Sequence, residues 1–245
     1  MKREFPQLFW GLVALAVALL LAAFVAAQAV QQARRSGDEI SVTGSARVWI
    51  VSDRASLSVT VSDTQNTAQD AYAAVQRGAA ALGGFLTAQG VPEGEILRGG
   101  VQTEPVTYTV TDDAGRSVQR GAFKISRRFT VQSADLNRVQ ALAQNVGTLI
   151  QQGVPVSADP VQYLYTKLAD VRLKLLADAT RDARERAQAI AQASGSGVGA
   201  VRSARMGVFQ ITARNTVQAD DYGSFDTASR EKDVTAVVGV TFAVR

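Results

Sequence analysis

The sequence predicts an α+β fold, with mainly antiparallel strands and three amphipathic helices on one face, preceded by one transmembrane helix. Three observations predict it. An uncharged apolar run lies near the N-terminus, several later segments alternate apolar and polar residues, and between them apolar residues recur every three or four positions. Strand groups separated by helices are typical of the α+β class.

The N-terminal run, residues 8–30, reads LFWGLVALAVALLLAAFVAAQAV and contains no charged residue. A helix of about 20 apolar residues spans a bilayer, so we expect an anchor here. The basic residues Lys2 and Arg3 favour a cytoplasmic N-terminus for residues 1–7. The alternative is a cleaved signal peptide, since FVAAQA offers small residues at a cleavage site, although the run exceeds the usual h-region.

After a polar linker, residues 31–39, we expect one extracytoplasmic domain over residues 40–245. Its first part alternates as two strands that meet in a turn around Ser52 to Arg54. A helix follows, with Thr67 as its predicted N-cap, and it ends before Gly90 and Pro92. The buried stripe of this helix is expected at Ala71, Val75, Ala79, Leu82 and Leu86.

The middle of the chain predicts a strand pair on both sides of DDAG, residues 112–115, and then a helix opened by Asp135. A short strand is expected at residues 154–156. Thr166 is the predicted N-cap of the longest helix, residues 167–193, whose charged face offers i,i+4 ion pairs. These pairs are Lys174 with Asp178, Arg181 with Glu185, and Asp182 with Arg186.

The last part predicts strands over VGAVRSARMGVFQITAR and KDVTAVVGVTFAVR, separated by a polar segment. As one continuous strand, residues 202–214 would place Ser203, Arg205, Gly207, Phe209 and Ile211 on one face. Both faces mix apolar and polar residues. That pattern suits a strand that touches a neighbour, or a twisted internal strand whose arginine stems lie along apolar surface.

The composition excludes several kinds of chemistry. The chain has neither cysteine nor histidine, so disulfides, thiolate nucleophiles, Cys/His zinc sites and a histidine base are ruled out. The net charge is +4 and the basic residues are scattered, so we expect no nucleic-acid binding. No cofactor or metal is predicted.

Two glycine- and aspartate-rich segments resemble ligand loops only superficially. GSGVGA, residues 195–200, follows a helix and enters a strand, which inverts the order of a dinucleotide-binding loop. The aspartates near DAGR and ADDYGSFD do not have the spacing of a calcium loop and are expected in solvated turns. These aspartates are Asp112, Asp113, Asp220, Asp221 and Asp226.

No catalytic group stands out, and we expect the protein not to be an enzyme. No motif places a lysine beside a serine on a strained turn, and the carboxylates fall in turns or on charged helix faces. A carboxylate-based hydrolase is the remaining enzymatic alternative. The residues predicted as oligomer or partner contacts are Arg205, Met206, Phe209, Ile211, Tyr222 and Phe225.

From about Ile40 to Arg245 the chain resembles the SIMPL domain proteins of bacterial cell envelopes. The resemblance rests on ISVTGSARVWIVSDRA, GVPEGEI, YLYTKLADVRLKLLADATRDARERAQAIAQASGSGVG, SARMGVFQI and EKDVTAVVGVTF. The motifs YTKLADV, ARMGVFQI and DYGSFDTAS are similar to the branch with one N-terminal membrane helix. SDRA at Ser52 and GAFKISRRF at Gly121 depart from many relatives.

The resemblance implies an α+β extracytoplasmic domain, homo-oligomeric assembly and a link to envelope or oxidative stress. It implies no catalytic residues. The leading hypothesis is therefore a membrane-anchored, non-enzymatic, homo-oligomeric scaffold in the periplasm or otherwise outside the cytoplasmic membrane. The alternative is an envelope binding module that recruits a protein partner or small ligand through its sheet or the 215–232 loop.

Overall fold

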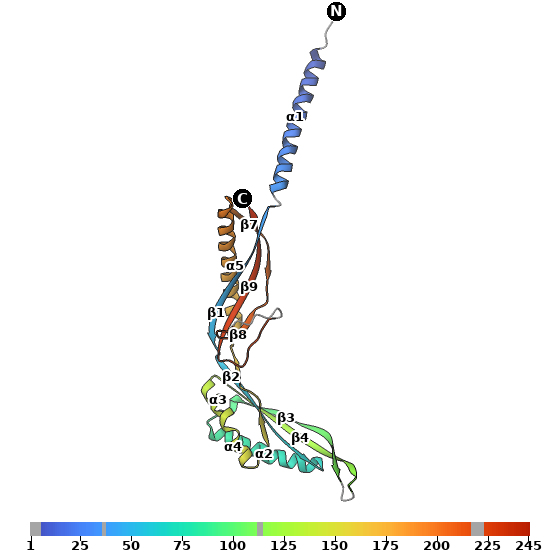
Figure 1. Cartoon of the computed structure of the whole chain (residues 1–245), viewed down its shortest axis with the longest axis vertical. Helices are drawn as coiled ribbons and strands as arrows, with labels where there is room; N and C mark the ends of the chain where they lie inside the picture. The colour runs from blue at the N-terminus through green and yellow to red at the C-terminus, as the bar shows by residue number, and fades with distance from the viewer. Residues whose placement is uncertain (1–5, 36–37, 112–114, 217–222) are drawn as a thin grey trace, which may run out of the picture. The chain divides into compact units, whose positions relative to one another are not determined.

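The computed structural model describes residues 6–35, 38–111, 115–216 and 223–245 (Figure 1). Its first helix, α1 (Pro6–Arg35), contains the span Trp10–Gln28, with 19 residues and a mean hydropathy of 2.5. No other described part of the chain buries the side chains of this span. By length and composition this helix is either a membrane anchor or a signal sequence.

The chain divides into two compact units. Unit 1 combines residues 1–47, 172–209 and 235–245, and unit 2 combines residues 48–171 and 210–234. The strands β1 (Glu39–Val51) and β9 (Glu231–Val244) and the helix α5 (Leu168–Ala193) contribute residues to both. Each unit has its own apolar core.

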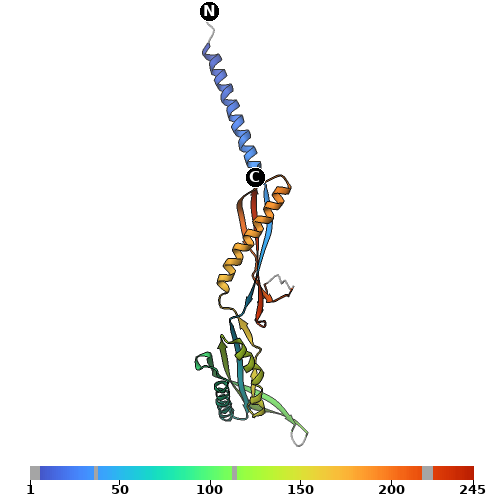
Figure 2. The ribbon, with the colours of Figure 1, turned by 90° about the vertical axis from the view of Figure 1, so that its left-hand side faces the viewer.

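The unit 1 core lies between α5 and a sheet in which β9 runs between β1 and β7 (Val198–Met206), as Figure 2 shows. Strand β8 (Gln210–Ala213) also pairs with β9. The buried side of α5 is made of small residues four positions apart, so the helix approaches the sheet closely. They are Ala179, Ala183 and Ala187, which pack against Val238, Val240 and Phe242.

Strand β1 passes close to α5 at Gly44. A Cβ atom at Gly44 would lie 2.1 Å from the carbonyl oxygen of Ala179, so no larger residue fits. Beside it, the main-chain N–H of Ser45 donates to Asp182 Oδ2 at 2.8 Å, and Arg186 Nε donates to the same oxygen at 2.9 Å. These hydrogen bonds, the Ser45 N–H first, lower the pKa of the Asp182 carboxyl.

Unit 2 is an antiparallel sheet in the order β3-β4-β2-β5, with helices packed on it. The strands are β2 (Arg54–Gln65), β3 (Ile96–Thr111), β4 (Ser117–Ser133), β5 (Val156–Ala158) and β6 (Gln162–Leu164), the last also paired with β2. The helices are α2 (Ala68–Ala88), the 3-10 turn η1 (Glu93–Glu95), α3 (Leu136–Asn145) and α4 (Thr148–Gln151).

The α+β class with antiparallel strands is confirmed. The local helix signals are confirmed as well. The Thr67 hydroxyl accepts the N–H of Asp70 at 3.1 Å, and the Asp135 carboxylate accepts the N–H of Arg138 at 3.0 Å. The five predicted stripe residues of α2 are all buried.

The structure differs from the sequence prediction in how helices are divided. α2, α3 and α4 pack in unit 2, whereas α5 packs on the separate sheet of unit 1. The helix expected after Asp135 is broken at Gly147 into α3 and α4. The strand expected at residues 154–156 begins later, as β5, and β6 beyond Pro160 was not predicted.

Two details at α5 also differ. The Thr166 hydroxyl, two residues before the helix begins, donates to Asp53 Oδ2 at 2.6 Å. Of the predicted ion pairs, Asp182 with Arg186 is confirmed, but Arg181 bonds Asp178 at 3.0 Å instead of Glu185.

Candidate binding surfaces

The outer edge of β7 is an exposed strand edge in unit 1. Within the described residues, β7 pairs with β9 and with no second strand. The Gly207 N–H donates to the Val237 carbonyl at 2.9 Å, and Arg205 lies opposite Gly239. Because hydrogen-bonded pairs alternate in antiparallel ladders, the main-chain groups of Ala204 and Met206 point to the outer edge.

This edge is flanked by exposed apolar side chains. Met206 is 61% exposed, and Val201 and Val208 are also exposed. The strand carries register shifts between Val198 and Ser203, which leave Ser203–Met206 as its regular part. A short regular edge with exposed apolar residues is a template for pairing with another strand.

The prediction of one continuous strand through Ile211 was wrong. The chain leaves β9 after Gly207 and resumes strand pairing at Gln210, as β8. A Cβ atom at Gly207 would lie 3.1 Å from the Val237 carbonyl, so the chain passes unusually close to β9 at this break. The face alternation predicted from residue 202 to 214 therefore holds only within each strand.

The predicted contact residues fall in both units. Arg205, Met206 and Phe209 belong to unit 1, whereas Ile211 and Phe225 belong to unit 2. Tyr222 lies outside the described residues. The Phe209 ring is half-buried, with the Arg172 guanidinium carbon 5.5 Å from its centroid.

Ile211 and Phe225 do come together. Main-chain hydrogen bonds join their segments, from Ile211 to Ser224 at 2.7 Å and from Asp226 to Ile211 at 2.8 Å. The Ile211 side chain is buried in unit 2, whereas the Phe225 side chain is 61% exposed. Of this pair, Phe225 is the residue that can meet a partner.

Arg205 contributes to an open groove of about 350 Å³ in unit 1. Four of the eight residues that line the groove carry hydroxyl groups, and Ser41 and Thr241 share a hydrogen bond of 2.8 Å between their hydroxyl oxygens. Other residues that line it are Thr43, Ser203 and Arg205. Such a shallow, hydroxyl-rich surface suits a polar contact with another chain.

Unit 2 holds a small cavity beside Phe225, with Lys232 and Asp226 in its wall. Its volume is about 60 Å³, and its other lining residues are Ile50, Tyr163, Leu164, Tyr165, Leu168 and Ile211. Pockets that hold drug-sized ligands measure roughly 300–1,000 Å³. This cavity therefore has room for about one inserted side chain.

Lys232 is the basic residue in the wall of this cavity. It is buried, and its Nζ donates to the main-chain oxygen of Asp226 at 2.5 Å. Burial lowers the pKa of the Lys232 ammonium, partly offset by the Asp226 charge. Burial raises the pKa of the Asp226 carboxyl. The hydrogen bonds from Ser229 and Ala228 and the Lys232 charge lower it by more, so the pKa lies below its ordinary value.

Sequence patterns alone do not single out this pair. The sequence signal was weak, namely a lysine at the start of an otherwise apolar strand pattern. Of the aspartates considered for calcium, Asp226 lies here, and Asp112, Asp113, Asp220 and Asp221 lie outside the described residues. Within the described residues, no three acidic, histidine or cysteine side chains gather as a metal site.

The chain matches a known protein family over most of its length. A family model described as SIMPL, protein of unknown function (DUF541), matches residues 40–242. No curated protein matches the chain. The matched region contains all of the surfaces described above.

Proposed function

Because the chain belongs to the SIMPL family, we propose that it is a membrane-anchored, extracytoplasmic, non-enzymatic protein whose copies form a homo-oligomeric scaffold. The proposed setting is the bacterial cell envelope, with a role in envelope or oxidative stress. The exposed edge of β7 carries the proposal, because it offers each copy a place to bind another.

The anchor is proposed to be α1. Its apolar span is long enough to cross a bilayer, and the preceding Lys2 and Arg3 favour a cytoplasmic N-terminus. Residues 40–242, the family region, then lie outside the cytoplasmic membrane.

Two β7 strands can pair antiparallel about a two-fold axis at Ala204. In that register Ala204 faces its own copy, and the outward main-chain groups of each strand meet those of the other. Arg205 of one copy lies opposite Ser203 of the other, so the two Arg205 charges do not face each other. The pairing would join two unit 1 sheets into one.

The β7 edge is tested with Ala204→Pro in the full chain, extracted in mild detergent. Proline removes the outward N–H of this residue while leaving a strand edge intact, so we expect a smaller oligomer without loss of the thermal midpoint. The matched control is Ala204→Val, which keeps the N–H and should keep the oligomer of the natural chain. Native mass spectrometry reads both, and unchanged association of Ala204→Pro would contradict the β7 contact.

A second candidate function is a binding module at the unit 2 cavity. The observation that favours it is exposed Phe225 beside a cavity of about 60 Å³, enough for one apolar side chain of a protein partner. The segment that carries Phe225 is held by the Lys232 and Ile211 hydrogen bonds, so the cavity is a preformed feature.

This candidate is tested with Phe225→Ala and a matched control, Ile150→Ala. Both remove an exposed apolar side chain of unit 2, 61% and 59% exposed. If the cavity binds a partner, one defined protein crosslinked in membranes is lost from Phe225→Ala only. Equal crosslinking in both variants would contradict the cavity as a binding site.

A further inference from the structure

The end of the β3–β4 hairpin is a ribbon of only two strands. β2 pairs with β4 from Ala55↔Ser133 to Gln65↔Phe123 and then stops. Beyond that point β3 and β4 continue to pair, from Val106↔Ala122 to Thr111↔Ser117, and the hairpin projects past α2 (Figure 1). A two-stranded hairpin alone is marginally stable in water, so a cover would stabilise it.

The two faces of this ribbon differ. Residues that pair across an antiparallel ladder share a face. One face, here called the ribbon face, consists of Val106, Tyr108, Val110, Val118, Arg120 and Ala122. The opposite face consists of Thr107, Thr109, Thr111, Ser117, Gln119 and Gly121, and is polar.

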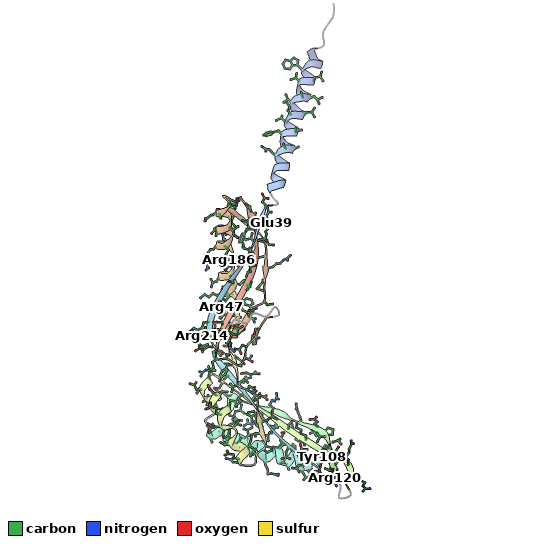
Figure 3. All side chains as sticks on the ribbon, viewed as in Figure 1. Glu39, Arg47, Tyr108, Arg120, Arg186 and Arg214 are labelled. Carbon is green, nitrogen blue, oxygen red and sulfur yellow. The ribbon has the colours of Figure 1, made fainter. Side chains whose placement is uncertain are left out.

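The ribbon face is apolar and partly exposed: Ala122 is buried, and Val106 and Val110 are half-buried. Tyr108 and Val118 are each 41% exposed. The Tyr108 hydroxyl donates to Asn66 Oδ1 at 3.2 Å, and because Asn66 follows β2, the ring reaches across β4. Figure 3 shows Tyr108 and Arg120 near each other at the end of the hairpin.

Charged residues border this apolar area without forming ion pairs. Glu104 and Lys124 are a cross-strand pair on the same face, next to Val106 and Ala122. Among the described residues, Glu104, Lys124 and Arg120 have no salt-bridge partner within 4.0 Å. The ribbon face therefore offers both signs of charge to a partner.

We propose that a second copy of this chain covers the ribbon face, with the two ribbons parallel and β3 of each over β4 of the other. In this arrangement, two residues that pair across the β3–β4 ladder within one copy also face each other between the two copies. Val110 meets Val118, the Tyr108 ring meets the Arg120 guanidinium as a cation–π pair, and Glu104 meets Lys124. The surface is complementary to itself, which is what an isologous contact requires.

The charges also favour one of the two possible directions of the second ribbon. If the second ribbon were turned end for end about Val106, Lys124 of one copy would lie over Arg120 of the other. Like charges in direct opposition are unfavourable, so the parallel direction is preferred.

This inference rests on the self-association proposed above but uses a different surface. Two strand edges alone form a small contact, whereas stable interfaces bury roughly 1,000 Å² or more. A chain with two isologous contacts, one on β7 and one on the ribbon face, can associate beyond a dimer.

The first test mixes charge variants of the full chain, with different tags, in mild detergent. Glu104→Lys and Lys124→Glu each place like charges across the ribbon contact, so each alone should lower the ribbon association constant by roughly tenfold. Mixed together, the two variants restore opposite pairs, so mixed complexes should exceed either self-complex by native mass spectrometry. Because each variant serves as the folding control for the other, a mixture without this preference overturns the proposal.

The second test uses single cysteines, which are unambiguous because the chain has no cysteine. Differently tagged Val110→Cys and Val118→Cys chains should form an interchain disulfide under mild oxidation. Thr109→Cys mixed with Gln119→Cys, on the polar face, should not. Val110→Cys mixed with Gln102→Cys tests the reversed direction, and equal or greater crosslinking there, or on the polar face, overturns the parallel arrangement.

The outcomes separate this inference from the proposed function. Oligomers that persist but show neither the charge preference nor the Val110–Val118 crosslink refute the ribbon contact and leave the β7 scaffold. A chain that stays monomeric in all mixtures refutes both.

Discussion

The ammonium group of Lys232, which is buried, donates a hydrogen bond of 2.5 Å to the main-chain oxygen of Asp226. Asp226 in turn accepts the N–H of Ala228 at 2.8 Å, and its Oδ2 lies 3.7 Å from Lys232 Nζ. One lysine at the start of β9 thereby holds the turn that precedes it and places Phe225 at the cavity.

Replacing this lysine should destabilise unit 2. Lys232→Met keeps the apolar stem but leaves the Asp226 carboxylate without its cation, so we expect a loss of about 3 kcal/mol in the free energy of unfolding. Denaturant unfolding of the full chain in mild detergent measures it. Lys174→Met on exposed α5 surface is the control and should change little. Equal stability of both variants would mean that Lys232 does not hold this turn.

Acid should weaken unit 1 through Asp182. The pKa of this carboxyl is lowered by the Ser45 N–H and by Arg186, so the folded form binds fewer protons than the unfolded form. Its stabilising contribution is therefore present above the ordinary value of 3.8 and is lost as pH falls through the lower folded pKa.

Thermal melting measures this effect. Between about pH 6 and about pH 2.5, the midpoint of the natural chain should fall more than that of Asp182→Asn, which has no charge to lose. The control is Asp178→Asn, on the same helix. The Asp178 carboxylate accepts a hydrogen bond from Arg181 but none from a main-chain N–H of the described residues. If Asp182→Asn and the natural chain follow the same pH profile, the contact with Ser45 does not matter for stability.

Gly44→Ala should disrupt the packing of α5 on β1. The added Cβ would lie 2.1 Å from the Ala179 carbonyl and 2.5 Å from the Ala183 nitrogen, and neither main-chain atom can move without moving the helix. We expect a loss of about 3 kcal/mol, at the upper end for overpacking. The control is Gly84→Ala in α2, where an added Cβ would meet no neighbouring group within 4 Å. This variant should raise the free energy of unfolding by up to about 1 kcal/mol. A melting midpoint unchanged in Gly44→Ala would contradict the close approach.

Local features of the fold could be predicted from the sequence because their causes lie within a few residues. Thr67 and Asp135 cap helices whose first N–H groups are three residues away, and the stripe of α2 follows from helical spacing. The break at Gly147 was missed because apolar residues continue at helical spacing on both sides of it.

Features that depend on distant residues could not be predicted. The division into two units follows from β9 pairing with β1, far away in the chain. The hairpin around residues 112–115 was expected, but its two-stranded end depends on where β2 stops at Gln65. Lys232 is an ordinary lysine in the sequence until the fold buries it beside Asp226.

The most direct test of the central claim is the mass of the full-length protein extracted from membranes, measured by native mass spectrometry in mild detergent. The scaffold proposal predicts a discrete multimer of uncleaved chains that retain α1. A monomer at high concentration, or a chain cut after Ala27, would contradict the anchored homo-oligomer.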